Sequence, residues 1–310
     1  MKELKIFAGR SHPELAREIC AHVGVEPGQI SFVTFSNENL KIKIEENVRE
    51  CDVFVIQTSC SPVHDHLLEL LIMIDALKYA SAARITAVLP YYPYVRSDKK
   101  DEPRISVTAR LVADLLQTAG AHRILTMNLH ASQIVGFSHI PVDHLDGIPV
   151  ICDYLKTQPL ENFAAVATDV GRAKVTEAYA RRLHMPVVIL DKRRYADDEK
   201  AVIRHVIGDV SGKNAIFFDD EILTGGSIFA GIDVLRERGA MHFKAACVHG
   251  VLARDAVTRL ENSVLEELVI TNTLPQRQTS PKIKTRSIAQ LFGEAIKAIH
   301  TGSSVSRLFS

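Results

Sequence analysis

The feature that most restricts the fold of this chain is a regular alternation of short β-rich runs with helical patterns. The β-rich runs are residues 6–8, 53–57, 85–89 and 124–127 in the first half, and residues 164–167, 187–190, 215–218 and 245–248 in the second. Such alternation is typical of βαβ units, in which parallel strands form a sheet that helices cover. The sequence therefore predicts an α/β protein.

The alternation returns in two halves of similar length, which indicates a duplicated domain. The chain has 310 residues, which is enough for two domains of about 150 residues each. Between the halves lies Asp146-Gly147-Ile148-Pro149, whose Gly and Pro favour a turn over a regular element. We expect one domain over residues 1–146 and a second over residues 147–310.

Composition restricts the partners and the compartment. Lys plus Arg and Asp plus Glu number 37 each, so the chain has no net charge that would favour nucleic acid or an anionic membrane. The five cysteines are scattered without the spacing of metal ligands, which is typical of reduced thiols in the cytosol. The chain starts directly with a strand pattern, and no apolar run reaches the roughly 18 residues of a membrane span. We expect a cytoplasmic protein that binds neither nucleic acid nor membrane.

The stretch of residues 215–227, AIFFDDEILTGGS, predicts a strand, a loop and the start of a helix. Glycines let the backbone approach a ligand, and the N–H groups at a helix start favour an anion such as phosphate. The carboxylates of Asp219 and Asp220 cannot bind that phosphate. They would instead accept hydrogen bonds from sugar hydroxyls or bind a hard cation such as Mg²⁺. A sugar phosphate fits this pattern, and an ordinary strand-to-helix turn with surface acids is the alternative.

Residues 96–104 form a densely charged segment before a helix that we expect over residues 107–118, with Ser106 as its cap and Gly120 as its stop. The segment has little apolar surface to bury, so we expect it to be mobile until a ligand orders it. A nucleotide triphosphate could do so, and a solvated charged loop is the alternative. The cations available for its phosphates are Arg96, Lys99, Lys100 and Arg104.

Two further candidates lie in the first half. Phe35-Ser36-Asn37-Glu38-Asn39 follows an expected strand, and an aromatic ring beside amide side chains could hold a purine; an ordinary loop is the alternative. His130 follows the β-rich run 124–127, at the strand end where ligands bind in open α/β sheets. A neutral imidazole there could bind a metal ion or donate to a phosphoryl oxygen.

The second half repeats this pattern of polar residues at strand ends. Asp169 places a carboxylate after the β-rich run 164–167, and Asp191-Lys192-Arg193-Arg194 follows the run 187–190. Clustered cations stabilise the charge that develops during phosphoryl transfer. A solvated basic turn is the alternative for this cluster.

Nearly the whole chain resembles the ribose-phosphate diphosphokinases, also called phosphoribosyl diphosphate synthetases, of type I phosphoribosyltransferase fold. Matching segments include FAGRSHPELA, VRECDVFVIQ, GAHRILTMNLHASQIVGF, DKRR, GDVSGKNAIFFDDEILTGGS and TNTLPQ. The resemblance implies two similar phosphoribosyltransferase-like (Rossmann-like) domains, with parallel sheets flanked by helices. It also implies a transferase of nucleotide biosynthesis that moves the diphosphoryl group of ATP to ribose 5-phosphate, giving phosphoribosyl diphosphate and AMP. The implied cofactor is Mg²⁺, and the implied assembly is a homo-oligomer, a hexamer or one based on dimers.

The same resemblance implies roles for individual residues. The residues that would bind ATP are Phe35, Asn37, Asn39, Arg96, Asp98 and Lys99. Those that would bind ribose 5-phosphate are Asp169, Asp219, Asp220, Thr224, Gly225, Gly226 and Ser227. The implied catalytic residues are Lys192, Arg194 and His130, and the implied metal ligands are His130 and Asp169.

Several positions depart from the family pattern. Asn39, Asn128, His139 and Leu223 stand where acids are usual, and Arg172 stands where a glycine is usual. Without a carboxylate at Asn128 or His139 an additional cation site would be weaker, although Asp143 lies nearby in sequence. Asn39 bears on nucleotide preference, and Arg172 on diphosphate placement.

Two other functions therefore stay open. One is a diverged diphosphokinase that acts on another ribosyl phosphate such as ADP-ribose, and the other is a non-catalytic regulatory homologue that assembles with active subunits. The full set of candidate acids, cations and His130 favours the active enzyme, because a scaffold has no need of them.

Overall fold

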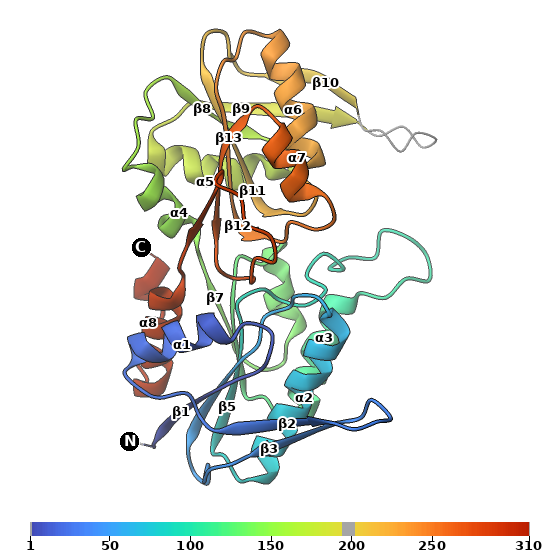
Figure 1. Cartoon of the computed structure of the whole chain (residues 1–310), viewed down its shortest axis with the longest axis vertical. Helices are drawn as coiled ribbons and strands as arrows, with labels where there is room; N and C mark the ends of the chain where they lie inside the picture. The colour runs from blue at the N-terminus through green and yellow to red at the C-terminus, as the bar shows by residue number, and fades with distance from the viewer. Residues whose placement is uncertain (1, 194–201, 310) are drawn as a thin grey trace. The chain divides into compact units, whose positions relative to one another are not determined.

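The fold is described from a computed structural model of the chain (Figure 1). The structure describes residues 2–193 and 202–309. Contacts divide the chain into two compact units. Unit 1 comprises Met1–Asp146, Thr273–Pro275 and Ser287–Ser310, and unit 2 comprises Gly147–Asn272 and Gln276–Arg286. The boundary at 146–147 coincides with the expected join. The expected range 147–310 differs from unit 2 at its carboxyl end, because the last helix packs in unit 1.

The described residues of unit 1 contain a five-stranded parallel sheet in the order β1-β4-β5-β6-β7. Its helices are α1, which packs against α8, and α2, which packs against α3, and Figure 1 shows the two pairs on opposite sides of the sheet. The strands are β1 (Leu4–Ala8), β4 (Asp52–Ile56), β5 (Arg84–Leu89), β6 (Arg123–Met127) and β7 (Val142–Leu145). The helices are α1 (Pro13–Val23), α2 (Val63–Tyr79), α3 (Thr108–Ala119) and α8 (Ala289–Thr301), with the 3₁₀ turns η1 (Ser132–Phe137) and η3 (Ser306–Phe309).

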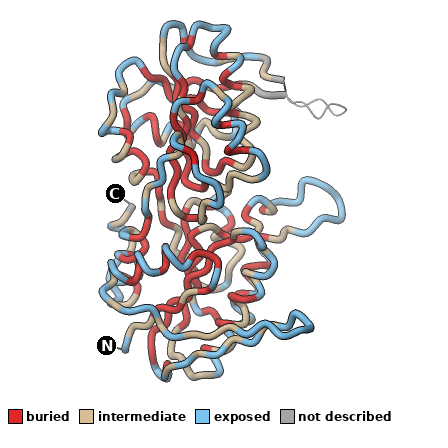
Figure 2. The backbone as a smooth tube through the Cα atoms, in the orientation of Figure 1, coloured by how far each residue is buried: buried red, intermediate tan, exposed pale blue. Residues whose placement is uncertain are grey.

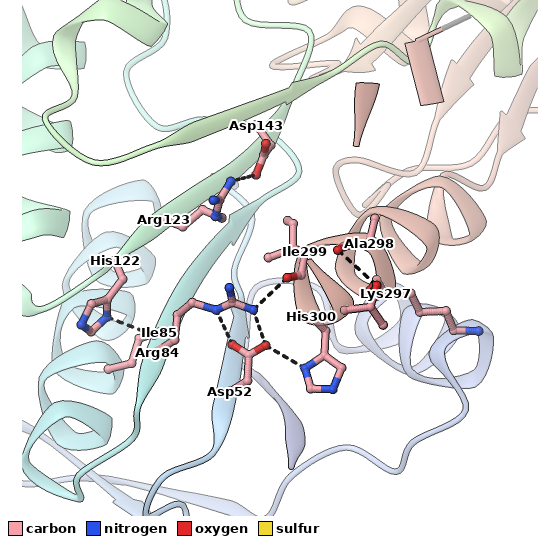
Figure 3. Close-up of polar contacts among 11 residues, drawn as sticks. Asp52, Arg84, Ile85, His122, Arg123, Asp143, Lys297, Ala298, Ile299 and His300 are labelled. Atoms are coloured by element: carbon pink, nitrogen blue, oxygen red, sulfur yellow. Dashed lines mark hydrogen bonds and ion pairs between the residues drawn. The ribbon is translucent and has the colours of Figure 1, made fainter. Parts of the chain in front are cut away.

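Helix α8 returns from the end of the chain to complete unit 1. At Gly293 it approaches α1 so closely that an added Cβ would lie 3.0 Å from the Cβ of His22. At its carboxyl end, Arg84 donates from Nε to Asp52 Oδ1 over 2.7 Å and from Nη2 to the carbonyl oxygen of Ile299 over 2.9 Å (Figure 3). His300 Nδ1 lies 2.8 Å from Asp52 Oδ2. These contacts fix the last helix to strands β4 and β5.

An antiparallel two-stranded arm, β2 (Ile30–Thr34) with β3 (Leu40–Ile44), also belongs to unit 1. Its inner side chains, such as Phe32 and Ile42, pack against the core, whereas residues 35–39 form an exposed turn at its tip. Figure 2 shows buried residues along the strands of each unit, and an exposed arm tip and exposed loop after β5.

The described residues of unit 2 contain a seven-stranded sheet in the order β10-β9-β8-β11-β12-β13-β14, parallel except for the β9–β10 pair. The strands are β8 (Phe163–Ala167), β9 (Val187–Arg193), β10 (Val202–Ile207), β11 (Asn214–Ile222), β12 (Phe243–Gly250), β13 (Leu265–Thr271) and β14 (Ile283–Arg286). The helices are α4 (Ile148–Leu155), α5 (Ala173–Leu183), α6 (Gly226–Glu237) and α7 (Ala256–Asn262), with the 3₁₀ turn η2 (Val170–Arg172).

Alternation along β11 explains why helices cover both faces of this sheet. Ile216 and Phe218 pack with α4 and α5, whereas Phe217, between them, packs on the other face with α6 and α7. Each unit thus has a parallel sheet between helices, which confirms the predicted fold class.

Candidate active site

The acid pair Asp219 and Asp220 lies inside strand β11. We expected the acids at the end of the strand that contains residues 215–218, but β11 continues past them to Ile222 and stays paired with β12 as far as Gly250. Both carboxylates are largely buried, with side chains 16% and 7% exposed. The pair is therefore held by a central strand and not by a loop.

The turn after β8 brings Thr168 and Asp169 to the same edge of the sheet, since β8 pairs directly with β11. Thr168 Oγ1 donates to Asp219 Oδ2 over 3.1 Å. Asp169 caps η2, and its Oδ1 accepts the backbone N–H of Arg172 over 3.1 Å. Sequence reasoning selected Asp169 and missed Thr168, whose only signal was its place beside Asp169 at the strand end.

Arg172 spans the acid pair. Its Nε lies 3.1 Å from Asp219 Oδ1, and its Nη1 lies 2.9 Å from Asp220 Oδ2. Its side chain is 18% exposed, so these ion pairs are only partly screened by water. We noted this arginine as a departure from the family pattern, but nothing in its spacing predicted contact with both acids.

Burial governs the charge of this cluster. It raises the pKa of Asp219 to about 8, with hydrogen bonding and repulsion from Asp220 adding to the rise and Arg172 opposing it. Burial would lower the pKa of Arg172, but the charges of Asp220 and Asp219 outweigh it and raise that pKa. Two buried acids that share one guanidinium are therefore harder to ionise fully than two exposed aspartates.

The loop Thr224-Gly225-Gly226-Ser227 leads into α6, as expected. Gly225 has φ 71°, a left-handed conformation that favours glycine, and an added Cβ there would lie 2.8 Å from the Phe229 ring. At Gly226 the nearest atom to an added Cβ is Thr224 Oγ1 at 3.7 Å, so no protein contact demands glycine. The N-cap residue of α6 is Gly225, which has no side chain with which to cap the helix. The helix start can therefore accept an anion close to its backbone.

The predicted cation Lys192 lies in β9, in the outer part of the same sheet. We expected residues 191–194 to follow a strand that ends at residue 190, but β9 continues through Arg193 and pairs with β10, with Arg193 opposite Val202. Lys192 is thus a strand residue, and its side chain is outside the described part of the structure. Arg194 lies outside the described residues.

In unit 1, Arg96, Asp98 and Lys99 lie in the loop after β5. Asp98 is buried, whereas Arg96 and Lys99 are exposed. Ser97 anchors the loop, because its Oγ donates to Ser106 O over 3.0 Å and accepts the N–H of Thr108 over 3.1 Å. Ser106 was expected to cap α3, but Ser97 takes that role from the other side of the loop. Helix α3 ends at Gly120 as expected.

His130 follows β6 and is half-buried. Beside it, Asn128 has φ 36° and donates to Asp146 Oδ1 over 3.1 Å, and Leu129 N–H donates to His144 Nε2 over 2.8 Å. Burial lowers the pKa of His144, which keeps this acceptor neutral. Asp143, named above as an acid near the weakened cation site, instead pairs with Arg123 over 2.6 Å (Figure 3).

The predicted adenine-binding residues occupy the tip of the β2–β3 arm. Phe35 is 49% exposed, its N–H donates to Asn39 O, and Asn39 N–H donates to Asn37 Oδ1 over 3.2 Å. Figure 1 shows this tip well apart from the loop after β5, although both belong to unit 1. One chain therefore does not bring Phe35, Asn37 and Asn39 together with Arg96, Asp98 and Lys99.

The residues that were predicted as metal ligands lie in different units, His130 in unit 1 and Asp169 in unit 2. Among the described residues, no group of three or more His, Cys, Asp or Glu side chains is placed to hold a metal ion.

The parallel sheets, the buried acid pair and the glycine loop at a helix start define a phosphoribosyltransferase-type fold. Comparison with known proteins agrees over nearly the full length. The N-terminal domain of ribose phosphate pyrophosphokinase matches residues 4–120, and the phosphoribosyl synthetase-associated domain matches residues 194–310.

Relatives include ribose-phosphate pyrophosphokinases of Clostridium acetobutylicum, 48% identical over 99% of this chain and 98% of that protein, and of Caldanaerobacter subterraneus subsp. tengcongensis, 47% identical over the same shares. The crystal structure of phosphoribosylpyrophosphate synthetase from Mycobacterium smegmatis is 41% identical, with TM-score 0.92 over 97% of this chain and all of that one. The chain belongs to the ribose-phosphate pyrophosphokinase family, a family of phosphoryl-transferring enzymes. This favours the main prediction over both alternatives. No helix of the described residues is long and apolar enough to cross a membrane.

Proposed function

We propose that this chain transfers the β,γ-diphosphoryl group of ATP to the anomeric oxygen of ribose 5-phosphate. A bond forms between that oxygen and the β-phosphorus, the bond from the β-phosphorus to the α,β-bridging oxygen breaks, AMP leaves and the hydroxyl proton is released. The products are phosphoribosyl diphosphate and AMP. The observation that carries this proposal is the buried acid pair of β11 directly before the glycine loop of α6.

The sugar phosphate would bind in unit 2. The N–H groups of residues 224–227 would hold the 5-phosphate at the positive end of the α6 dipole, and the open space at Gly226 would admit it. Asp219 and Asp220 would accept hydrogen bonds from ring hydroxyls. Holding both ends of the sugar would fix the direction of its anomeric oxygen, and such positioning supplies much of the catalysis in phosphoryl transfer.

ATP would bind through unit 1, with Arg96, Asp98 and Lys99 near its phosphates and ribose. The adenine-binding residues Phe35, Asn37 and Asn39 project on an arm away from that loop. We propose that a second copy of the chain supplies them, which requires a homo-oligomer, a hexamer or one based on dimers. An exposed aromatic at the end of an arm suits such a role, because it offers a ring for stacking at low conformational cost.

Mg²⁺ would be held with ATP by His130 and Asp169. When bound, it would neutralise phosphate charge and fix the diphosphoryl group for in-line transfer. The η2 turn orients Asp169 by the hydrogen bond from Arg172 N–H. Lys192 and Arg194 would stabilise the charge of the transferring group.

The experiment that tests this function is an assay of purified protein with Mg²⁺, ATP and ribose 5-phosphate, in which AMP formation is followed while each component is omitted in turn. ADP-ribose as a second acceptor tests the diverged kinase. Formation of AMP only with ribose 5-phosphate supports the proposal. Turnover with ADP-ribose alone, or no turnover at all, would support one of the two alternatives. We further propose a cytoplasmic location, in keeping with the free cysteines.

A further inference from the structure

The guanidinium of Arg172 occupies one oxygen of each acid, and a sugar that bridged the two acids would need these oxygens. Asp219 Oδ2 already accepts from Thr168 Oγ1, and Asp220 Oδ1 accepts from the N–H of Glu221 over 2.9 Å. These two donors are fixed by the sheet edge and by the backbone. The remaining oxygens, Asp219 Oδ1 and Asp220 Oδ2, are the two that Arg172 contacts.

Asp219 Oδ1 is the more crowded of the two. It accepts the backbone N–H of Asp220 over 2.9 Å as well as facing Arg172 Nε. A carboxylate oxygen has about two acceptor positions, so both positions of Oδ1 are in use. Two neighbouring sugar hydroxyls that bridged the two acids would therefore need the acceptor positions that the guanidinium already uses.

Arg172 is able to leave. It stands at the start of α5 with an 18% exposed side chain, whereas the strand that carries the acids lies between β8 and β12. A long arginine side chain at a helix start changes rotamer more readily than a paired central strand moves. When ligand and guanidinium compete for the same oxygens, the arginine is thus the group that moves.

We propose that Arg172 is a built-in competitor for the acid pair: it closes the sugar subsite in the free enzyme and is displaced when ribose 5-phosphate binds. This inference rests on the proposed function, because it takes the acid pair as the ribose subsite. Arg172 thereby sets the affinity for the sugar phosphate and is a specificity-determining residue. A sugar without two adjacent hydroxyls to replace both guanidinium contacts is rejected at this subsite.

One opposing effect must be separated from the competition. The positive charge of Arg172 also attracts the phosphate of the substrate over a distance, and its removal weakens that attraction. Salt separates the two, because at about 0.15 M ionic strength charges beyond about 8 Å are largely screened, whereas the partly buried contacts are not. Measurements at low and moderate salt therefore report the two effects differently.

The test is calorimetric titration of ribose 5-phosphate into the wild-type protein and into Arg172→Gly, Arg172→Gln and Arg172→Lys. At moderate salt we expect Arg172→Gly and Arg172→Gln to bind about tenfold more tightly, and Arg172→Lys to fall between, because an ammonium does not span two carboxylates as a guanidinium does. Arg172→Gln keeps a side chain at the helix start, so it decides the matter if Arg172→Gly does not fold. A non-hydrolysable ATP analogue is titrated in parallel, because a change in its affinity alone would indicate an effect on the nucleotide and not on the sugar subsite.

Arg181→Ala is the matched control. Arg181 lies on the same helix, is exposed and pairs with Glu177, so its removal changes the net charge equally without touching the acid pair. We expect unchanged ribose 5-phosphate affinity for it. If Arg172→Gly and Arg172→Gln bind ribose 5-phosphate no more tightly than the wild-type protein at moderate salt, the proposal that Arg172 competes with the sugar is wrong.

The outcomes also separate this inference from the proposed function. If the wild-type protein fails to bind ribose 5-phosphate and Arg172→Gln binds it, the competitor is supported and the wild-type activity is refuted. If neither protein binds the sugar phosphate, both proposals fail.

Discussion

Arg84 donates hydrogen bonds from both Nε and Nη2 to the carboxylate of Asp52, and its Nη2 also donates to the carbonyl oxygen of Ile299. One guanidinium thus joins two neighbouring strands to a helix from the far end of the chain. The hydrogen bond that Arg84 donates to Asp52 is the main reason that the pKa of Arg84 is raised.

We predict that Arg84→Ala destabilises unit 1, because it leaves the buried Asp52 carboxylate with only His300 beside it. Breaking a buried pair costs about 3–5 kcal/mol, but Arg84 is 33% exposed, so we expect a loss of about 1–3 kcal/mol in the free energy of unfolding. Urea unfolding measures it. Arg110→Ala, which breaks an exposed helical pair with Asp114, should cost about 0.5 kcal/mol or less. Equal costs for the two variants would contradict the role of Arg84.

For the acid pair, we predict that the double variant Asp219→Asn and Asp220→Asn loses ribose 5-phosphate binding while a non-hydrolysable ATP analogue still binds. An amide has one acceptor oxygen where a carboxylate has two, and its NH₂ group can only donate. Calorimetry with both ligands is the measurement. Asp209→Asn, at a surface aspartate paired with Lys213, serves as the control. If the double variant keeps its affinity for ribose 5-phosphate, Asp219 and Asp220 do not bind the sugar.

The raised pKa of Asp219 predicts a pH dependence of stability. Between about pH 4, its unfolded pKa, and about 8, its folded pKa, the folded protein holds a proton that the unfolded chain has released. The free energy of unfolding therefore falls as pH rises through this window. Denaturant unfolding of wild type and Asp219→Asn at several pH values tests this. In the variant, the free energy of unfolding should decrease less with rising pH, by on the order of a few kcal/mol at most. Parallel pH profiles for the two proteins would exclude Asp219 as the source of the decrease.

Lys192→Ala and Arg194→Ala should each lower kcat by orders of magnitude with little change in unfolding free energy, because groups that stabilise developing charge act mainly on the transition state. Steady-state kinetics with both substrates is the measurement. Lys213→Ala, a surface variant of the same unit, should leave kcat unchanged. Near-normal turnover in either test variant would remove that residue from the mechanism.

We predict that the loop over residues 96–104 closes on the nucleotide and excludes water from the transferred group. Its backbone amides should gain hydrogen-exchange protection when a non-hydrolysable ATP analogue and Mg²⁺ are added. The double variant Lys99→Ala and Lys100→Ala should impair turnover more than AMP binding, because AMP lacks the β- and γ-phosphates. Lys297→Ala on α8 is the control for lost charge. Identical exchange with and without the analogue would refute closure.

Much of the fold was predictable because its signals are local. Strand β4, DVFVI, is buried along its whole length, as expected of a parallel sheet covered on both faces. Gly120 and the glycines before α6 marked helix boundaries by the same local chemistry. The glycine loop and acid pair were found for this reason.

What could not be predicted depends on neighbours that are distant in sequence. Strands β9 and β11 run further than their apolar cores suggest, because adjacent strands continue to pair with their polar residues. The contact of Arg172 with Asp219 and Asp220 arises from the adjacency of β8 and β11, which sequence order does not reveal. The same holds for α8, whose pattern gave no sign of which sheet it covers.

The return of α8 to unit 1 has a consequence for the order in which the protein is made. A ribosome synthesises every strand of unit 2 before it synthesises α8, the helix that packs against α1 and contacts Asp52. The first unit to emerge is therefore the last to be finished, and its unfinished surface is exposed to chaperones and proteases throughout translation. Removal of residues 287–310 would accordingly destabilise unit 1, which contains the first strands of the chain, and leave unit 2 intact.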